Sequence, residues 1–363
     1  MGYPSVTLPV DRWPAPDRRL WQQASNGDDL LDEAGRAAHW TPKTRAQVAK
    51  DYGRFLFWLA ANDRLDAQQA PAARLCPARL RDYLTHLQAT GMASTSLLSR
   101  LRGLRQAISV LDPTADLSTL ARACTRLKAQ AVPRRQKHLR LVDPAELVAR
   151  AQAHHQALIA GGRPLPMRRC NHARDALMLA FLAHRPLRLA NFAALQLGTH
   201  LIRTAAGARL VLTADETKER RCYEASFPDD LLPMLDHYLA EIRPRLLHGQ
   251  PSQHLWVSMH GTPLSESAVY YQITKITRRL LGQPINPHLI RDCVLTALAT
   301  DAPANVRAGA RILGHRDLAT GEAHYNHATA TTAQRAYLEV LAAWRRKAMA
   351  ASNGAPSHSS TGE

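Results

Sequence analysis

The sequence predicts a mainly α-helical protein of two domains, the second of which also carries a small antiparallel β-sheet. Apolar residues recur at three- and four-residue spacing through most of the chain, and the pattern becomes strand-like only near residues 208–228. The length of 363 residues exceeds that of one typical core, which favours two domains. Hydrophobic residues make up 45% and charged residues 21% of the chain, so most of it is expected to fold.

The first part of the chain predicts an arm followed by an all-helical domain. Residues 1–38 are rich in Pro, Asp and Arg with little periodicity, and we expect a flexible N-terminal arm there. Residues 39–130 predict a helical domain, in which Thr41 is a candidate N-cap and Pro42 suits the first helical position. Gly91 is expected to end the second helix. The helices of this domain are expected at 41–61, 77–91, 94–111 and 116–130.

A basic linker is predicted at residues 131–140, "AVPRRQKHLR". It contains a proline and several basic side chains but no apolar stripe. One interpretation is a solvated linker, and the other is a strap that lies on a phosphate backbone. The charge of the whole chain favours the strap, whose candidate DNA contacts are Arg134, Arg135, Lys137 and Arg140.

The second domain is predicted at residues 141–349. Asp143 is a candidate N-cap, followed by Pro144 at the first helical position. Further helices are expected within 172–197 and from about residue 265 onwards. Between them, "ARLVLTAD" and "RCYEASFP" predict a β-hairpin around "ETKER", and "HLWVS" at 254–258 is a candidate third strand. The tail, 350–363, is predicted to be disordered.

The charge balance points to a polyanionic partner. Lys and Arg total 47 against 30 acidic residues, a net charge of +17, which favours nucleic acid first and an anionic membrane second. The longest apolar run, "ALMLAFLA", is far shorter than a bilayer-spanning helix, and the first residues lack a signal-peptide core. Five scattered cysteines without a CxxC pair favour reduced thiols and a cytoplasmic location. "CNH" at 170–172 has no second pair at ligand spacing, so no metal is expected.

One candidate anion site lies in "NPHLIRD". Asn286 and Pro287 suit a helix start, which places His288 in the first turn, where the backbone N–H groups and the helix dipole favour an anion. Arg291 lies three residues later on the same face. This spacing occurs often by chance, and the alternative for Arg291 is an ordinary surface residue.

A second candidate group lies in "RILGHRDLATGEAHY". Gly314 is a candidate helix stop, His315 follows it directly, and Tyr325 comes ten positions later (325 − 315 = 10). Taken singly, such a histidine is usually a cap and such a tyrosine a packing residue.

Together these segments resemble the tyrosine recombinases, the phage integrase family. In that family an Arg in a helix–helix junction precedes a small hairpin with a Lys, and H-x-x-R, L-G-H and a nucleophilic Tyr follow. The matching pieces here are "PLRLANFAAL", "ETKER", "HLIRD", "LGH" and Tyr325. The resemblance covers about 140–345 by motif, and the upstream helices resemble the core-binding domain by pattern alone. It implies the integrase-like, DNA breaking-rejoining fold.

The resemblance also implies a role for each matching residue. Two arginines would clamp the phosphate, because fixed cations stabilise the extra negative charge of the pentavalent centre. The histidines would donate to the same phosphate, the lysine would protonate the departing 5′ oxygen, and the tyrosine would form a 3′-phosphotyrosyl link. Such a reaction needs no cofactor and no metal. The residues expected to act are Arg188, Lys218, His288, Arg291, His315 and Tyr325.

The match leaves two choices open and departs from the family in three places. Arg185 competes with Arg188, and Arg220 or Arg221 competes with Lys218. The family often has an acidic residue where this chain has Asn191, and often a His where this chain has Asp292. The interval before the tyrosine is also one residue longer than the commonest.

The resemblance implies a site-specific recombinase or integrase that acts on double-stranded DNA as a tetramer on two sites, with a mobile element as one setting. A type IB topoisomerase is the nearest alternative, and a non-catalytic DNA-binding protein that retains the fold is another. The amphipathic segment 331–350 is expected to dock on a neighbouring protomer, or alternatively on its own domain.

Overall fold

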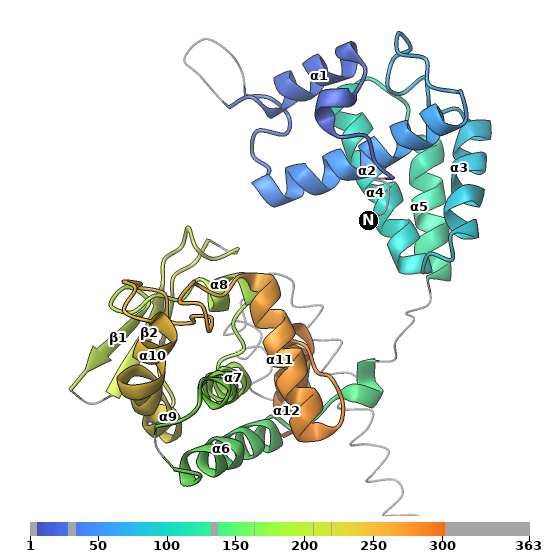
Figure 1. The fold of residues 1–363 in the computed structure, drawn as a ribbon. Helices are drawn as coiled ribbons and strands as arrows, with labels where there is room; N and C mark the ends of the chain where they lie inside the picture. The colour runs from blue at the N-terminus through green and yellow to red at the C-terminus, as the bar shows by residue number, and fades with distance from the viewer. Residues whose placement is uncertain are drawn as a thin grey trace, which may run out of the picture. The chain divides into compact units, whose positions relative to one another are not determined.

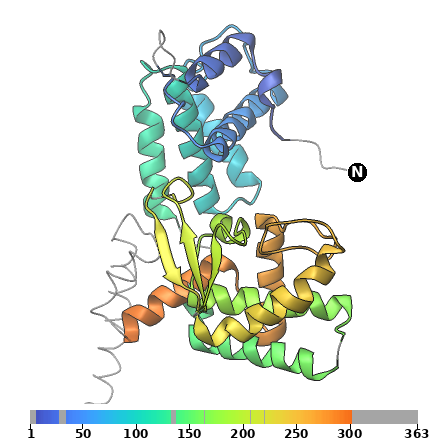
Figure 2. The ribbon, with the colours of Figure 1, turned by 90° about the vertical axis from the view of Figure 1, so that its left-hand side faces the viewer.

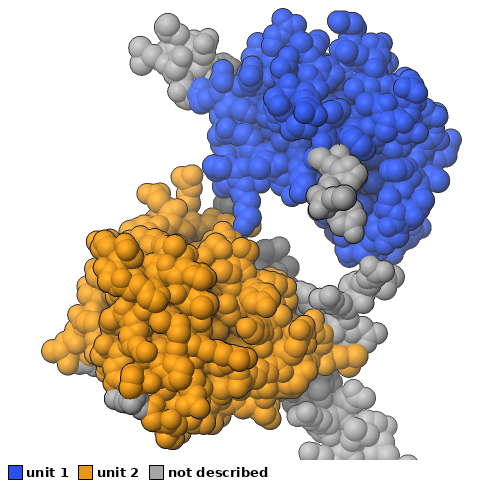
Figure 3. Space-filling view, viewed as in Figure 1, with its two compact units in different colours: residues 1–136 blue, residues 137–363 orange. Residues whose placement is uncertain are grey.

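The computed structural model describes residues 6–27, 34–131, 137–162, 164–205, 207–218 and 220–301, without the side chains of residues 137, 138 and 301. It divides the chain into two compact units, Met1–Gln136 and Lys137–Glu363, which Figure 3 colours separately. The division falls inside the linker that the sequence predicts at 131–140. We refer to these parts as unit 1 and unit 2.

Unit 1 contains the four helices that the sequence predicts. Thr41 caps the first of them, because its hydroxyl accepts the Thr44 N–H at 3.2 Å, and Gly91 follows the next with a φ of 69°. Apolar residues from α2 and α4, among them Tyr52, Phe55 and Leu101, are fully buried in its core. The helices of unit 1 are η1 (Val10–Arg12), α1 (Ala15–Ser25), α2 (Pro42–Ala61), α3 (Pro77–Ala89), α4 (Ser94–Leu111) and α5 (Ser118–Gln130) (Figure 1).

The flexible arm expected for residues 1–38 is wrong for the part that the structure describes. Trp13 and Trp21 are buried in the core of unit 1, and the Trp13 ring meets that of Tyr52 edge-on at 4.9 Å. Asp17 is fully buried, accepts the Tyr52 hydroxyl at 2.7 Å and pairs with Arg74 at 2.5 Å. The polar composition of this segment therefore gave no indication that its aromatic and charged side chains are buried against later parts of unit 1.

A glycine permits the close approach of the N-terminal segment to α2. The Leu8 N–H donates to the Gly53 carbonyl at 3.0 Å. A Cβ on Gly53 would lie 2.2 Å from the Leu8 carbonyl oxygen, so any other residue would push the segment away.

Unit 2 is built around helix α7 (Met167–His184), whose side chains from Ala173 to Ala183 are all buried. Helices α6 (Pro144–Ala160), α11 (Glu266–Leu281) and α12 (Pro287–Asp301) pack around it (Figure 1). Asp143 caps α6 as predicted, by accepting the Ala145 N–H at 2.8 Å. The shorter helices are η2 (Lys137–Arg140), α8 (Leu189–Ala193), η3 (Asp229–Leu231), α9 (Leu232–His237), η4 (Tyr238–Ile242) and α10 (Arg243–Leu247).

The sheet has three antiparallel strands in the order β1 (Leu201–Thr204), β2 (Gly207–Leu212) and β3 (Tyr223–Ser226), which lie side by side in Figure 2. The β2–β3 hairpin is the predicted one. The third strand was predicted wrongly: residues 254–258 make only single bridges, Gln196↔His254 and Val257↔Pro263, and β1 pairs with β2 instead. Only one residue of β1 is buried, so it lacks the alternation that reveals a strand.

Replacing Asp17 by Ala is expected to destabilise unit 1 by about 3–5 kcal/mol, because it leaves Arg74 buried without its counter-charge. Urea unfolding followed by tryptophan fluorescence measures the loss. The control is Asp82→Ala, which breaks the exposed Arg64–Asp82 pair and should cost less than about 1 kcal/mol. Equal losses in the two variants would contradict the structural role of Asp17.

The stability of unit 2 is expected to fall as the pH drops from about 6.5 towards about 4. His155 of α6 is buried and lies 3.0 Å from the His237 ring, and burial lowers its pKa to about 4. The unfolded chain then binds a proton that the folded chain resists, so acid favours unfolding across this interval. Thermal unfolding at several pH values measures the slope, and His155→Gln should reduce it. An unchanged slope in the variant would exclude this histidine as a cause.

Candidate active site

The junction between α7 and α8 places the first candidate arginine. Pro186 cannot continue α7, and the chain turns there while Leu187 enters the core. Arg188 is the residue before α8, with an extended backbone (φ −62°, ψ 143°) and a partly exposed side chain. Phe192 of α8 is fully buried against Trp256, which fixes the short helix on the domain.

The competing arginine of the junction has a different set of partners. Both Nε and Nη2 of Arg185 donate to the Ser226 carbonyl of β3, at 3.3 and 3.1 Å, and Nη1 donates to the His184 carbonyl at 3.3 Å. Arg185 therefore attaches the hairpin to the end of α7, and the assignment of Arg188 to the phosphate stays a prediction.

The turn of the hairpin carries the candidate lysine. Asn191 of α8 donates from Nδ2 to the Glu216 carbonyl at 2.8 Å. The Glu216 carboxylate accepts from His200 at 2.6 Å. Lys218, Arg220 and Arg221 follow, and all three are exposed. The sequence gives no sign of the His200–Glu216 contact, because sixteen residues separate the partners and no local pattern joins them.

Helix α12 begins as the sequence predicts and carries the next two candidates. Asn286 Oδ1 accepts the Leu289 N–H at 2.9 Å, which confirms the N-cap. His288 is exposed in the first turn. Arg291 is only 7% exposed and donates from Nη1 to the Pro186 carbonyl, so the alternative of an ordinary surface residue is wrong.

Arg185 and Arg291 both act electrostatically on Tyr223 of β3. Burial raises the pKa of Tyr223 on β3, and the positive charges of Arg185 and Arg291 both oppose that rise. Two guanidinium groups from segments far apart in the sequence thus act on one phenol of the hairpin. The junction, the hairpin and α12 form one hydrogen-bonded cluster with a concentration of positive charge.

Several predicted residues lie outside the described part of the chain: His315, Tyr325, Arg134 and Arg135. Lys137 belongs to η2, and only its backbone is described. Arg140 is partly buried and donates to the Pro284 carbonyl, which holds the end of the linker against unit 2. Its contact with DNA stays a prediction.

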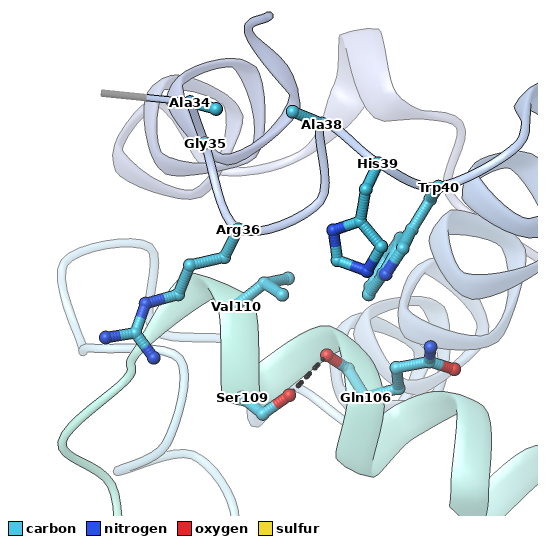
Figure 4. A pocket seen from close by; sticks show the side chains of 9 residues that line it. All are labelled: Ala34, Gly35, Arg36, Ala38, His39, Trp40, Gln106, Ser109 and Val110. Atoms are coloured by element: carbon cyan, nitrogen blue, oxygen red, sulfur yellow. Dashed lines mark hydrogen bonds between the residues drawn. The ribbon is translucent and has the colours of Figure 1, made fainter. Parts of the chain in front are cut away.

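Within the described ranges, no group of three His, Cys, Asp or Glu side chains is arranged to hold a metal ion. Over the same ranges, no helix is long and apolar enough to cross a membrane. A surface hollow lies within unit 1, between the turn at residues 34–40 and α4 (Figure 4). Arg36, His39 and Trp40 line one side of it and Gln106 and Ser109 the other, and it includes none of the predicted catalytic residues.

Unit 2 is mostly helical and carries a small antiparallel sheet, the architecture expected for the integrase-like, DNA breaking-rejoining fold. Residues 157–332 match the model of the phage integrase family. This part of the chain is similar to the tyrosine recombinases.

Two curated relatives illustrate the match. The chain is 31% identical to the tyrosine recombinase XerD of Halalkalibacterium halodurans over 104 residues, 28% of this chain and 34% of the relative. It is 30% identical to XerD of Staphylococcus saprophyticus subsp. saprophyticus over 112 residues, 31% of this chain and 37% of the relative. The matched stretch thus spans about a third of the length of these relatives.

One solved structure supports the fold. It is the XerH site-specific recombinase bound to a palindromic difH substrate in a post-cleavage complex, with a TM-score of 0.56. The two chains are 12% identical, and the alignment covers 91% of this chain and 98% of that one.

Removing the cap of α12 is expected to cost about 1 kcal/mol of stability in Asn286→Ala, because the first turn loses the acceptor for the Leu289 N–H. Asn286→Asp retains an acceptor and should stay close to the wild type. Thermal or urea unfolding of the two variants measures the difference. Equal stability of the alanine and aspartate variants would contradict a capping role.

Proposed function

We propose that this protein is a site-specific DNA recombinase or integrase that cleaves double-stranded DNA through a tyrosine nucleophile. The observation that carries the proposal is the hydrogen-bonded cluster of the α7–α8 junction, the β2–β3 hairpin and α12. These segments supply Arg188, Lys218 and Arg291, which the family motif assigns to phosphate binding and proton transfer.

The arginines would bind the phosphate under attack. Each guanidinium stays charged and offers a planar set of donors to the non-bridging oxygens. Arg291 is buried and tied to the Pro186 carbonyl, so its position is set before DNA arrives. Such preorganised charge lowers the barrier because it requires no reorganisation when the pentavalent centre forms.

The remaining residues would move protons. Tyr325 attacks phosphorus while His288 takes its proton, and the new bond is a 3′-phosphotyrosyl ester. The P–O5′ bond breaks, and Lys218 supplies the proton to the departing 5′ oxygen. His315 donates a hydrogen bond to the phosphate. Attack by the 5′ hydroxyl of a partner strand reverses the steps and completes the exchange, so the phosphodiester energy is conserved without a cofactor.

The surface of α11 is suited to contact DNA. Val269, Ile273 and Ile276 of this helix face the core, whereas Tyr271 and Lys275 are exposed. The Lys275 ammonium lies 5.9 Å from the centre of the Tyr271 ring. Cationic and aromatic side chains on one face can pair with phosphates and pack on the sugar–base edges. We assign the same role to the basic linker residues Arg134, Arg135, Lys137 and Arg140.

Assembly and location follow from the proposed reaction. Exchange between two duplexes requires four strand cleavages, so four protomers would act on two sites. Segment 331–350 is the candidate for the contact between neighbouring protomers, because it is amphipathic in sequence. The substrate would be DNA in the cytoplasm, with integration of a mobile element as one outcome of the reaction.

The Tyr325→Phe variant is expected to lose all covalent attachment to DNA, because phenylalanine has no oxygen to attack phosphorus. Wild type and variant are expressed in cells that carry the native flanking DNA, the lysate is denatured, and DNA that stays on the captured protein is sequenced. Tyr83→Phe, a change of a buried tyrosine in the core of unit 1 that keeps its ring, is the control and should retain the adduct.

The outcomes separate the alternatives. An adduct that persists in Tyr325→Phe would falsify the assignment of the nucleophile. DNA that is retained only without denaturation would indicate a non-catalytic DNA-binding protein. Relaxation of supercoils by wild type without strand exchange would indicate a topoisomerase.

A further inference from the structure

The turn of the β2–β3 hairpin is fastened to the rest of unit 2 at Glu216. Its backbone carbonyl accepts the Asn191 amide of α8 at 2.8 Å. Its carboxylate accepts the Thr213 N–H at 2.8 Å, the Thr213 hydroxyl at 2.9 Å and the His200 ring at 2.6 Å. One residue thus joins the turn to α8 and to the loop before β1.

The hydrogen bonds define the state of the histidine in this contact. Nδ1 of His200 accepts the Gln196 N–H at 3.0 Å, so this nitrogen carries the lone pair. The proton is therefore on Nε2, which donates to the ionised Glu216. The Thr213 N–H and the His200 ring hold the pKa of Glu216 below its usual value. The contact joins the Glu216 carboxylate to an imidazole that is only 7% exposed.

The other side of the turn is fixed by Thr217. Its hydroxyl donates to the Arg221 carbonyl at 2.7 Å and accepts the Arg221 N–H at 3.0 Å. The Arg220 N–H donates to the Thr217 carbonyl at 3.0 Å. Lys218 therefore extends from a backbone that is held on both sides, and its side chain is exposed.

We propose that Asn191 and Glu216 are positioning residues, which hold this turn against α8 so that Lys218 can reach the departing 5′ oxygen. The proposal rests on the proposed function and concerns one step of it, the protonation of the departing 5′ oxygen. Asn191 lies in the helix that begins directly after Arg188. The contact therefore sets the distance between a phosphate on Arg188 and a proton on Lys218.

The chemistry of the leaving group gives a test that distinguishes the positioning of Lys218 from a merely structural role. As the tyrosine–phosphorus bond forms and the P–O5′ bond breaks, the 5′ oxygen needs a proton, and a general acid contributes about 10²–10⁴-fold to such a step. A sulfur at the same position leaves as a thiolate, whose conjugate acid has a pKa of about 8.5, and it needs no proton. Substitution of sulfur for the bridging oxygen thus isolates the contribution of the lysine.

The experiment compares full-length wild type, Asn191→Ala and Glu216→Ala on two duplexes of the sequence recovered with the covalent adduct. One duplex has oxygen and the other sulfur at the scissile 5′ position. We expect the variants to form the adduct about 10- to 100-fold more slowly on oxygen, because small displacements of a reacting group cost rates of this order. On sulfur they should react at close to the wild-type rate, as should Lys218→Ala.

Two further variants sharpen the result. Asn191→Asp keeps the shape of the side chain but replaces the donor by an oxygen that faces a carbonyl, so it should reproduce the alanine pattern. Arg209→Ala removes the exposed Arg209–Glu224 pair of the same hairpin and should match wild type on both duplexes. Thermal unfolding of each variant shows that it is folded at the assay temperature.

The proposal is overturned if Asn191→Ala and Glu216→Ala lose activity equally on oxygen and sulfur, because the contact would then serve folding or DNA binding. It is also overturned if both variants cleave the oxygen duplex at the wild-type rate. Failure of wild type on both duplexes would instead overturn the proposed function, and this proposal with it.

Discussion

The arrangement of the site depends on the hydrogen bond between the Arg291 guanidinium and the Pro186 carbonyl. A buried guanidinium is costly unless its donors are matched, and the carbonyl of Pro186, in the loop between α7 and α8, supplies one match. The same junction holds β3 through Arg185 and the hairpin turn through Asn191. Three segments that are far apart in the sequence are therefore positioned by a single break between two helices.

The junction between α7 and α8 has a defined position because it follows a helix whose middle turns are buried. Within α7, the buried Arg174 binds Asp175 at 2.6 Å and the Val257 carbonyl at 2.7 Å. A central helix held by burial and by these contacts gives the residues after it a defined starting point. The core of unit 2 thus fixes the start of the junction, and with it the backbone positions of the charged residues there.

The sequence predicted those features that depend on neighbours in the chain. Helices α2 to α5 and α11 follow from apolar spacing, and Thr41 and Asn286 cap their helices as a local pattern indicates. The packing of α1 was missed because Asp17 finds its counter-charge in Arg74, 57 residues away. The contact of Arg185 with β3 was likewise not predictable, because no spacing in the sequence reveals the position of β3.

The departure at Asn191 has a physical explanation in the same contact. The family often places an acidic residue there, but an ionised carboxylate cannot donate to the Glu216 carbonyl as the amide does. The negative charge lies instead on Glu216, where Thr213 and His200 stabilise it. The Asn191 amide therefore binds the backbone of the turn, and the Glu216 carboxylate binds Thr213 and His200. A carboxylate at Asn191 would suit this hairpin only if the partner in the turn were a donor.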